Sequence, residues 1–274
     1  MSENRGLRRS VAAAVAGAGA LLAATVLAPQ ANAIIGGTDA TEEYAFVATL
    51  RDAGGHHFCG GALVDPQWVL TAAHCTGPGV PTDGFTVAVG STERTGGDER
   101  GVAEVITHPD FRADPTPHPE FPELELVWLH QDLALLRLDA PVPQAPVELA
   151  RRSAEPGTPV RALGWGMVCE VGEDCPEEQP PAVLQQLDTE IVPRERCEMD
   201  ARDLCTEHPT GAAQACILDS GGPVVRAGKD GWELDGVISR DGNYLEDPRC
   251  VGPMVLTDAS AYGEWIEATI VGRT

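Results

Sequence analysis

Two stretches decide the fold of this 274-residue chain: Thr71-Ala72-Ala73-His74-Cys75 and Asp219-Ser220-Gly221-Gly222-Pro223. A hydroxyl group becomes a nucleophile when a neighbouring base takes its proton and a carboxylate orients that base. His74 is a candidate base and Ser220 a candidate nucleophile. A third stretch between them, Asp132-Leu133-Ala134-Leu135-Leu136-Arg137-Leu138, supplies a candidate carboxylate in Asp132. The sequence therefore holds each side chain that acyl transfer by a serine requires.

These blocks occur in the order His, Asp, Ser, and more of the chain agrees with them. The block Phe58–Val64 (FCGGALV) precedes the first stretch. Two further short blocks are IIGG at Ile34–Gly37 and GWG at Gly164–Gly166. In this combination the chain resembles the chymotrypsin–trypsin family of serine proteases, over nearly all of residues 34–270. The TAAHC and DSGGP blocks are highly specific, whereas the DLALL block is weak alone.

The resemblance implies an all-β fold of two six-stranded antiparallel β-barrels packed face to face, with a C-terminal α-helix. We expect the N-terminal barrel over about residues 34–150, the C-terminal barrel over about 151–257 and the helix over about 258–270. Short apolar runs between Gly, Pro and Asp independently favour β-strands. Asp258 is a candidate helix cap, and the apolar residues after it fall near helical spacing.

The resemblance also implies roles for single residues. His74 would be general base and then acid, Asp132 would orient it, and Ser220 would attack the scissile carbonyl. The backbone N–H groups of Leu218 and Ser220 would form the oxyanion hole. Ser239 matches the serine that supports the triad aspartate.

Asp219 has a different expected role, as the partner of a new N-terminal amine. In the family this ion pair shapes the oxyanion hole, and a buried carboxylate without a partner is costly. A small-residue cleavage site, Ala31-Asn32-Ala33, directly precedes Ile34. We therefore expect removal of the leader to free the Ile34 amine and give active enzyme without a zymogen stage.

Two departures from the family concern the site itself. Leu218 stands where the family has glycine, and its side chain is expected to oppose the backbone conformation that aims the N–H. The specificity pocket also differs, with a non-tryptic preference and a small or unusual P1 residue expected. Its residues would be Gln214 at the floor and the crowding side chains Arg240, Asp241 and Met254.

Residues 1–33 have the layout of a secretory signal peptide: three arginines, an apolar run from Val11 to Ala28, and an A-x-A site. An uncleaved membrane anchor is the competing interpretation, because 18 apolar residues just reach spanning length. We expect a secreted, extracellular protein, monomeric and away from the membrane once the signal is cleaved. The leader carries three Arg and one Glu, so the remaining 241 residues have a formal charge of −25, against −23 for the whole chain. Such a charge argues against nucleic acid and anionic membranes as partners. The family resemblance implies a protein or peptide as substrate.

The eight cysteines all lie after the leader. An even number in an exported chain indicates four disulfides, and the CxxC pairs of a structural zinc site are missing. The family pairing implies Cys59–Cys75, Cys197–Cys205 and Cys216–Cys250, which leaves Cys169 with Cys175. No metal or cofactor is required by the proposed chemistry.

Other features have plainer interpretations. Residues 112–125 and 169–181 are rich in proline and acidic residues and are expected to be surface loops. The histidines other than His74 are expected on the surface or in loops; they are His56, His57, His108, His118, His130 and His208. An alternative to the active endopeptidase remains: a catalytically weak or inactive homologue that serves as a secreted binding protein, as Leu218 and the crowded pocket would favour.

Overall fold

The computed structural model describes residues 34–77, 79–80, 84–117, 125–167, 180–243 and 250–273. The expected signal peptide, with its competing interpretation as a membrane anchor, lies outside these residues, as does the pair Cys169 and Cys175. Among the described residues, no helix combines the length and the apolar character that a membrane crossing requires.

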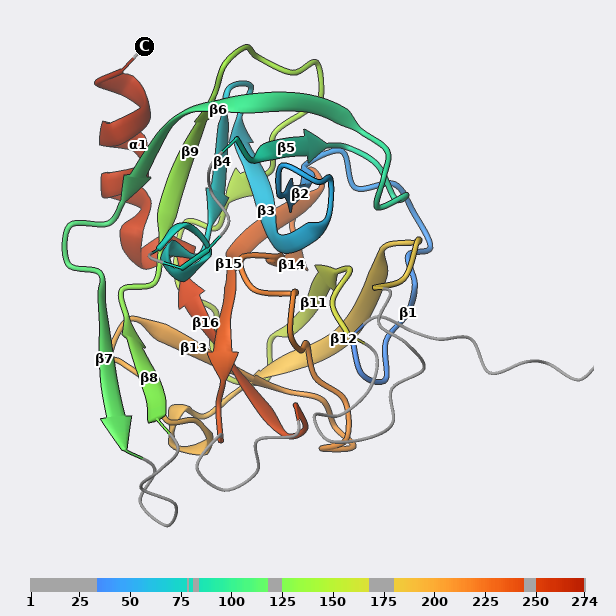
Figure 1. Ribbon diagram of the computed structural model, residues 1–274. Coiled ribbons are helices and arrows are strands. Elements are labelled where there is room, and N and C mark those ends of the chain that lie inside the picture. Colours follow the sequence, from blue (N-terminus) through green and yellow to red (C-terminus); the bar gives the residue numbers. More distant parts are fainter. Residues whose placement is uncertain are drawn as a thin grey trace, which may run out of the picture. The chain divides into compact units, whose positions relative to one another are not determined.

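The first half of the described chain forms a closed antiparallel barrel (Figure 1), in the order β2-β3-β4-β9-β6-β5. Its strands are β2 (Val47–Arg51), β3 (His57–Asp65), β4 (Trp68–Thr71), β5 (Thr86–Val89), β6 (Asp98–Thr107) and β9 (Ala134–Leu138). All five residues of β2 and all four of β4 are buried. Their apolar side chains fill the barrel interior, and this burial is the main stabilising contribution.

The second half forms another antiparallel barrel, in the order β12-β11-β14-β15-β16-β13, which the pairing of β12 with β13 closes. Its strands are β11 (Pro159–Gly164), β12 (Gln185–Val192), β13 (Asp203–Glu207), β14 (Pro223–Ala227), β15 (Trp232–Asp241) and β16 (Pro253–Asp258). Two short strands join this sheet: β1 (Thr38–Asp39) pairs with β12, and β10 (Glu148–Leu149) runs parallel to β15. The expected fold class of two six-stranded barrels is confirmed.

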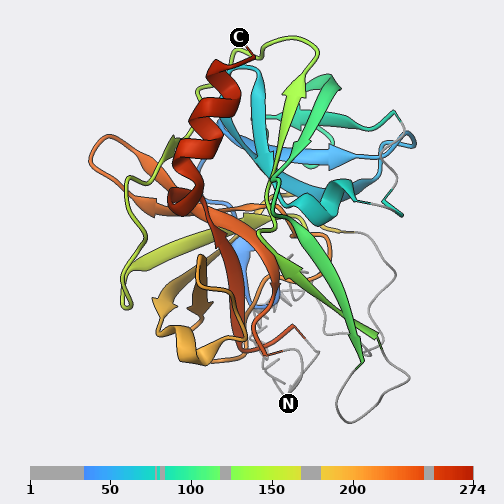
Figure 2. The ribbon, with the colours of Figure 1, turned by 90° about the vertical axis from the view of Figure 1, so that its left-hand side faces the viewer.

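The C-terminal helix α1 (Gly263–Val271) follows the second barrel but packs against the first (Figures 1 and 2). It is preceded by a 3-10 turn, η3 (Ala259–Tyr262), whose first N–H groups bond to the Asp258 carboxylate, as the sequence predicted. Tyr262 and Ile266 are buried in an apolar core to which strands of the first barrel contribute most residues, and Tyr262 and Trp265 pack on His108 at the end of β6. The helix therefore ties the end of the chain to the first barrel. The remaining short helices are η1 (Ala73–Thr76) and η2 (Arg194–Arg196).

One loop expectation is wrong in part. Within residues 112–125, the structure forms β7 (Arg112–Pro117), which pairs with β8 (Glu125–His130). The prolines in β7 are compatible with a strand because β7 pairs on one side only, so their missing N–H groups break no second ladder. All six residues of β7 are exposed, which explains why its sequence looks like that of a loop.

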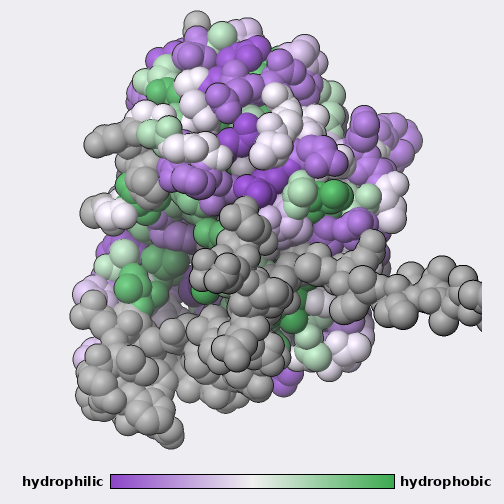
Figure 3. Space-filling view, turned by 45° about the vertical axis from the view of Figure 1, so that its right-hand side comes forward, coloured by the Kyte–Doolittle hydropathy of each residue, from purple (hydrophilic) through white to green (hydrophobic). Residues whose placement is uncertain are grey.

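The described surface is largely polar. Figure 3 shows mainly hydrophilic side chains over the upper part of the face that it presents, in line with the strongly acidic composition. A net charge of this size favours solubility.

Candidate active site

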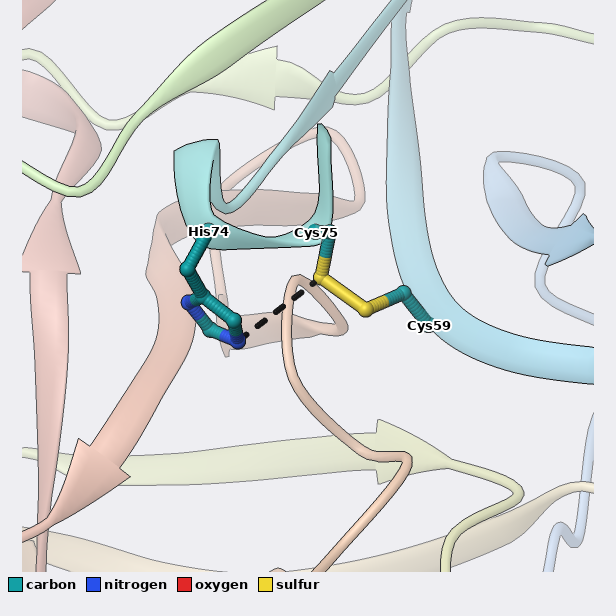
Figure 4. Close-up of side chains that lie close together, drawn as sticks. All are labelled: Cys59, His74 and Cys75. Carbon is teal, nitrogen blue, oxygen red and sulfur yellow. Dashed lines mark hydrogen bonds between the residues drawn. A yellow bond between two sulfur atoms is a disulfide. The ribbon is translucent and has the colours of Figure 1, made fainter. Parts of the chain in front are cut away.

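His74 lies on η1, directly after β4 has ended at Thr71. A disulfide between Cys75 and Cys59 of β3 holds this short turn against the first barrel (Figure 4). The His74 backbone N–H donates to Asp132 Oδ1 at 2.8 Å, and its Nδ1 lies 2.7 Å from Asp132 Oδ2. Two bonds to one carboxylate fix the plane of the imidazole and leave Nε2 as its free nitrogen.

Asp132 precedes β9 and is 1 % exposed. Its Oδ2 also accepts a hydrogen bond from the Ser239 hydroxyl of β15, at 2.7 Å. Burial opposes the charged form, but the charge and hydrogen bonds of His74 outweigh burial, so the pKa of Asp132 lies below its ordinary value. For His74, burial opposes the imidazolium, yet the charge and hydrogen bond of Asp132 hold its pKa above the ordinary value. The pair is thus built to stabilise a protonated imidazole.

Ser220 comes from the second barrel but contacts the first. Its carbonyl oxygen accepts from the Gly60 N–H at 2.8 Å and lies 3.7 Å from Cys75 Sγ. The same sulfur is 3.8 Å from His74 Nε2, the contact that Figure 4 marks. His74 and Ser220, which are 146 positions apart in the sequence, therefore both contact the Cys59–Cys75 disulfide.

Glycine allows this close approach of the two barrels. A Cβ on Gly221 would lie 2.2 Å from Thr71 Oγ1 and 2.6 Å from the Gly60 carbonyl oxygen. Gly221 also has φ of +77°, which L side chains rarely adopt. The DSGGP block thus needs its first glycine for space as well as for backbone conformation.

Leu218 adopts the left-handed conformation, with φ of +76°. The expected obstruction by its side chain is therefore not found, although a non-glycine residue in this region costs about 1–3 kcal/mol. The Ile217 carbonyl accepts from the Met167 N–H at 2.9 Å. Because N–H and C=O point in opposite directions across a trans peptide, the Leu218 N–H is turned away from Met167. Within the described ranges, neither the Leu218 N–H nor the Ser220 N–H has an acceptor.

His57 contacts the carbonyl group of Leu218, a contact that the sequence did not predict. It is 5 % exposed, and its Nε2 lies 3.1 Å from the Leu218 carbonyl oxygen, while its Nδ1 lies 2.7 Å from Thr49 Oγ1. Burial lowers the pKa of His57 to about 3, so the ring is neutral and its Nε2–H donates to Leu218. The expectation that this histidine lies on the surface is wrong; its place in β3, two residues before the buried Cys59, was the available signal. His108 is also buried, against Tyr262 and Trp265.

Asp219 is fully buried, and its carboxylate accepts from the Gly166 N–H at 2.7 Å and the Cys216 N–H at 2.9 Å. No cation among the described residues pairs with it, and burial raises the pKa of Asp219 to about 7. The Ile34 side chain is also fully buried, in the apolar core of the second barrel. The next residue, Ile35, bridges to Gln214 through two 3.0 Å backbone hydrogen bonds.

The expected pocket residues come together around the end of β15. Asp241 is paired with Met254 across β15 and β16, so the two side chains lie side by side on the same face of the sheet. Gln214 and Met254 are 2 % and 3 % exposed. Gln214 Nε2 donates to the Pro253 carbonyl at 2.7 Å, and its Oε1 has no partner in the described part of the chain. The Gln214 side chain is therefore closed to solvent. Arg240 does not point into it, but binds Asp203 instead.

In the described part of the chain, three disulfides join Cys59 to Cys75, Cys197 to Cys205 and Cys216 to Cys250, as the family pairing implies. One described group of possible metal ligands, Cys59, His74 and Cys75, lies close together. Both sulfurs are bonded to each other, so they are not available as thiolate ligands. Disulfides in this number fit an oxidising compartment.

Comparison with known proteins agrees with this fold. The family model described as Trypsin matches residues 34–266. The chain belongs to the trypsin family, and is by class a serine endopeptidase.

Its relatives include mammalian trypsins and other serine proteases. Anionic trypsin of Canis lupus familiaris is 30 % identical over 93 % of this chain and 97 % of its own length. Serine protease 57 of Rattus norvegicus is 32 % identical, over 77 % of this chain and 73 % of the relative. Among solved structures, neuropsin, a serine protease of mouse brain, aligns with a TM-score of 0.67 at 27 % identity, over 86 % of this chain and 100 % of that one.

Proposed function

We propose that this protein is a secreted serine endopeptidase that uses His74, Asp132 and Ser220 as a catalytic triad and forms an acyl-enzyme intermediate. The observation that carries the proposal is the chain of contacts from Ser239 to the buried Asp132 and on to His74 Nδ1, each 2.7 Å long. It links the two barrels and leaves His74 Nε2 to act on the serine. A signal peptide over residues 1–33, a catalytic domain over 34–270 and a monomeric secreted product complete the proposal. The disulfides support export.

In the first step His74 Nε2 takes the proton of the Ser220 hydroxyl as its oxygen attacks the scissile carbonyl. Asp132 stabilises the imidazolium that results. The developing oxyanion is received by the N–H groups of Leu218 and Ser220, which have no acceptor among the described residues. His74 then gives its proton to the leaving amine, and a water molecule hydrolyses the acyl-enzyme by the reverse proton route.

We further propose that the enzyme cleaves after small residues. Gln214, the expected floor of the pocket, is 2 % exposed, and the family resemblance places Asp241 and Met254 where an open pocket needs small side chains. Crowding by these two side chains would exclude a long P1 side chain and favour alanine or serine. Replacing both Asp241 and Met254 by glycine should widen the P1 preference in a peptide-library profile. An unchanged profile would contradict this assignment of the pocket.

A fluorophosphonate probe tests the catalytic proposal, because it labels only an activated serine. We expect the mature protein to be labelled and to hydrolyse a fluorogenic peptide with alanine at P1. The Ser220→Ala variant should do neither. If the native protein is not labelled either, the binding-protein interpretation takes precedence.

A further inference from the structure

Arg240 lies immediately after Ser239 on β15, and its guanidinium extends toward β13 and β8 rather than into the pocket. One nitrogen, Nη2, donates to Asp203 Oδ2 at 2.8 Å, and the guanidinium carbon lies 5.3 Å from the centre of the Trp128 ring. The side chain is 12 % exposed and that of Asp203 is 2 % exposed. An ion pair and a cation–π contact therefore hold this cation in one place.

The other nitrogen of the fork reaches toward the triad. Arg240 Nη1 donates to Ser239 Oγ at 3.4 Å, and the same hydroxyl donates to Asp132 Oδ2 at 2.7 Å. Asp132 Oδ2 in turn lies 2.7 Å from His74 Nδ1. Three contacts in series thus join a fixed positive charge to the imidazole.

We propose that Arg240 is a positioning residue for the reaction, which acts through Ser239 and Asp132 to limit the protonation of His74, while Asp203 sets how strongly it does so. The inference rests on the proposed function of the triad. It differs from the expectation that Arg240 merely crowds the specificity pocket. Asp132 alone favours the imidazolium, and a cation behind Asp132 opposes it, which keeps the base available at lower pH.

The charged groups around His74 give this effect its direction. Burial lowers the pKa of His74, Asp132 raises it, and Arg240 lowers it again. Behind Arg240 stand Asp203 on β13 and then Asp200, whose N–H bonds to Asp203 Oδ2.

Asp203 compensates Arg240 only in part. Burial raises the pKa of Asp203 above its ordinary value in spite of its bond to the guanidinium. Arg240 Nε is buried without an acceptor in the described part of the chain. The positive charge is therefore not fully cancelled where it faces the triad.

The expected size follows from Coulomb's law. Charges separated by roughly 8 Å interact by about 0.7 kcal/mol at an effective dielectric constant of about 60, a value for a site partly screened by water, and this shifts a pKa by about half a unit. Removing the cation in Arg240→Met should shift the acid limb of the pH profile of kcat/KM to higher pH, by about 0.5 pH unit. Below that limb, kcat/KM should fall about threefold, with little change on the plateau.

The partner gives the opposite sign. In Asp203→Asn the guanidinium loses its counter-charge, so the acid limb should move downward. Arg240→Lys keeps the charge and should stay nearer to the native limb than Arg240→Met. Loss of a merely structural contact would lower activity at every pH and would not move the limbs in opposite directions.

Arg161 provides a matched control. It binds Asp188 and lies 5.1 Å from the centre of the Trp232 ring, a similar environment that contributes no charge at His74. Arg161→Met should leave the limb unchanged. Limbs that stay in place in both Arg240→Met and Asp203→Asn, or that move in the same direction, would overturn the proposal.

A second readout does not need activity. In the Ser220→Ala background, the Nδ1 proton of His74 can be followed by NMR as the imidazole titrates. Arg240→Met should raise the titration midpoint and Asp203→Asn should lower it. If the native protein shows no hydrolysis or labelling, the proposed function fails, while this titration still decides whether Arg240 acts on His74.

Discussion

The buried Asp219 carboxylate predicts that the stability of this protein depends on whether its chain begins at Ile34. The perturbation is an extended chain that keeps Ala33, compared with one that starts at Ile34, both carrying Ser220→Ala to prevent self-cleavage. Without a cation, the folded chain holds the Asp219 proton up to a pKa of about 7, whereas the unfolded chain releases it near 3.8. The difference corresponds to on the order of 4 kcal/mol.

The direction follows from which state binds the proton more tightly. Below about pH 4 the Asp219 carboxyl group is protonated in both the folded and the unfolded state of the extended chain. It then does not lower the free energy of unfolding. As pH rises from about 4 to 7, the unfolded state loses its proton first, so the extended chain loses stability. A free Ile34 ammonium beside Asp219 would favour the carboxylate and lower its pKa, so the chain that starts at Ile34 should escape this loss.

Thermal unfolding followed by circular dichroism at pH 4 and pH 7.5 measures the effect. We expect nearly equal midpoints at pH 4, and a midpoint about 10 °C lower for the extended chain at pH 7.5. Asp219→Asn in the extended chain should remove its loss of stability between pH 4 and 7.5. A gap of the same size at both pH values, or one that survives Asp219→Asn, would refute the reasoning. Activity of the mature enzyme should also fall in alkali as the amine, near pH 8 when free, loses its charge.

Three further substitutions test the site. Leu218→Gly should relieve the strain of the left-handed backbone and raise the free energy of unfolding by about 1 kcal/mol in urea titrations, because this strain exceeds the entropic cost of glycine. The kcat of this variant should stay within tenfold of the native value, and a larger loss would show that the leucine shapes the oxyanion hole. Gly60→Ala should lower the unfolding midpoint and kcat/KM, because the new Cβ would lie 2.7 Å from Gly222 Cα across the two barrels; unchanged values would mean that this contact can relax freely. Ser239→Ala should reduce kcat/KM by about tenfold, since Asp132 loses a donor; a native rate would exclude a supporting role.

Strand content and the main chemical groups could be predicted from the sequence. Short apolar runs between turn residues indicate strands whatever their partners, and the blocks around His74 and Ser220 determine a known order of base and nucleophile. Asp258 was identified as a cap because its carboxylate acts on residues directly after it. Such local effects need no knowledge of distant contacts.

The misassigned residues depend on contacts with other segments of the chain. His57 looked like one more loop histidine until β3 turned it inward, between Thr49 and the Leu218 carbonyl. Residues 112–117 looked like a loop because all six are exposed and carry no buried apolar face, although β8 pairs with them. A leucine side chain opposes the left-handed conformation, yet Leu218 adopts it, with hydrogen bonds to the carbonyl groups of Ile217 and Leu218.

The sequence by itself determined which reactive groups this protein carries, their order, and the small residues that let backbones approach each other. Only the tertiary structure decided the direction of each side chain, as Arg240 illustrates: sequence placed it at the pocket, whereas the fold turned it to Asp203 and the triad. The physical reason is that side-chain direction depends on strand register and on charges from distant strands. Neither is encoded in the local pattern of residues.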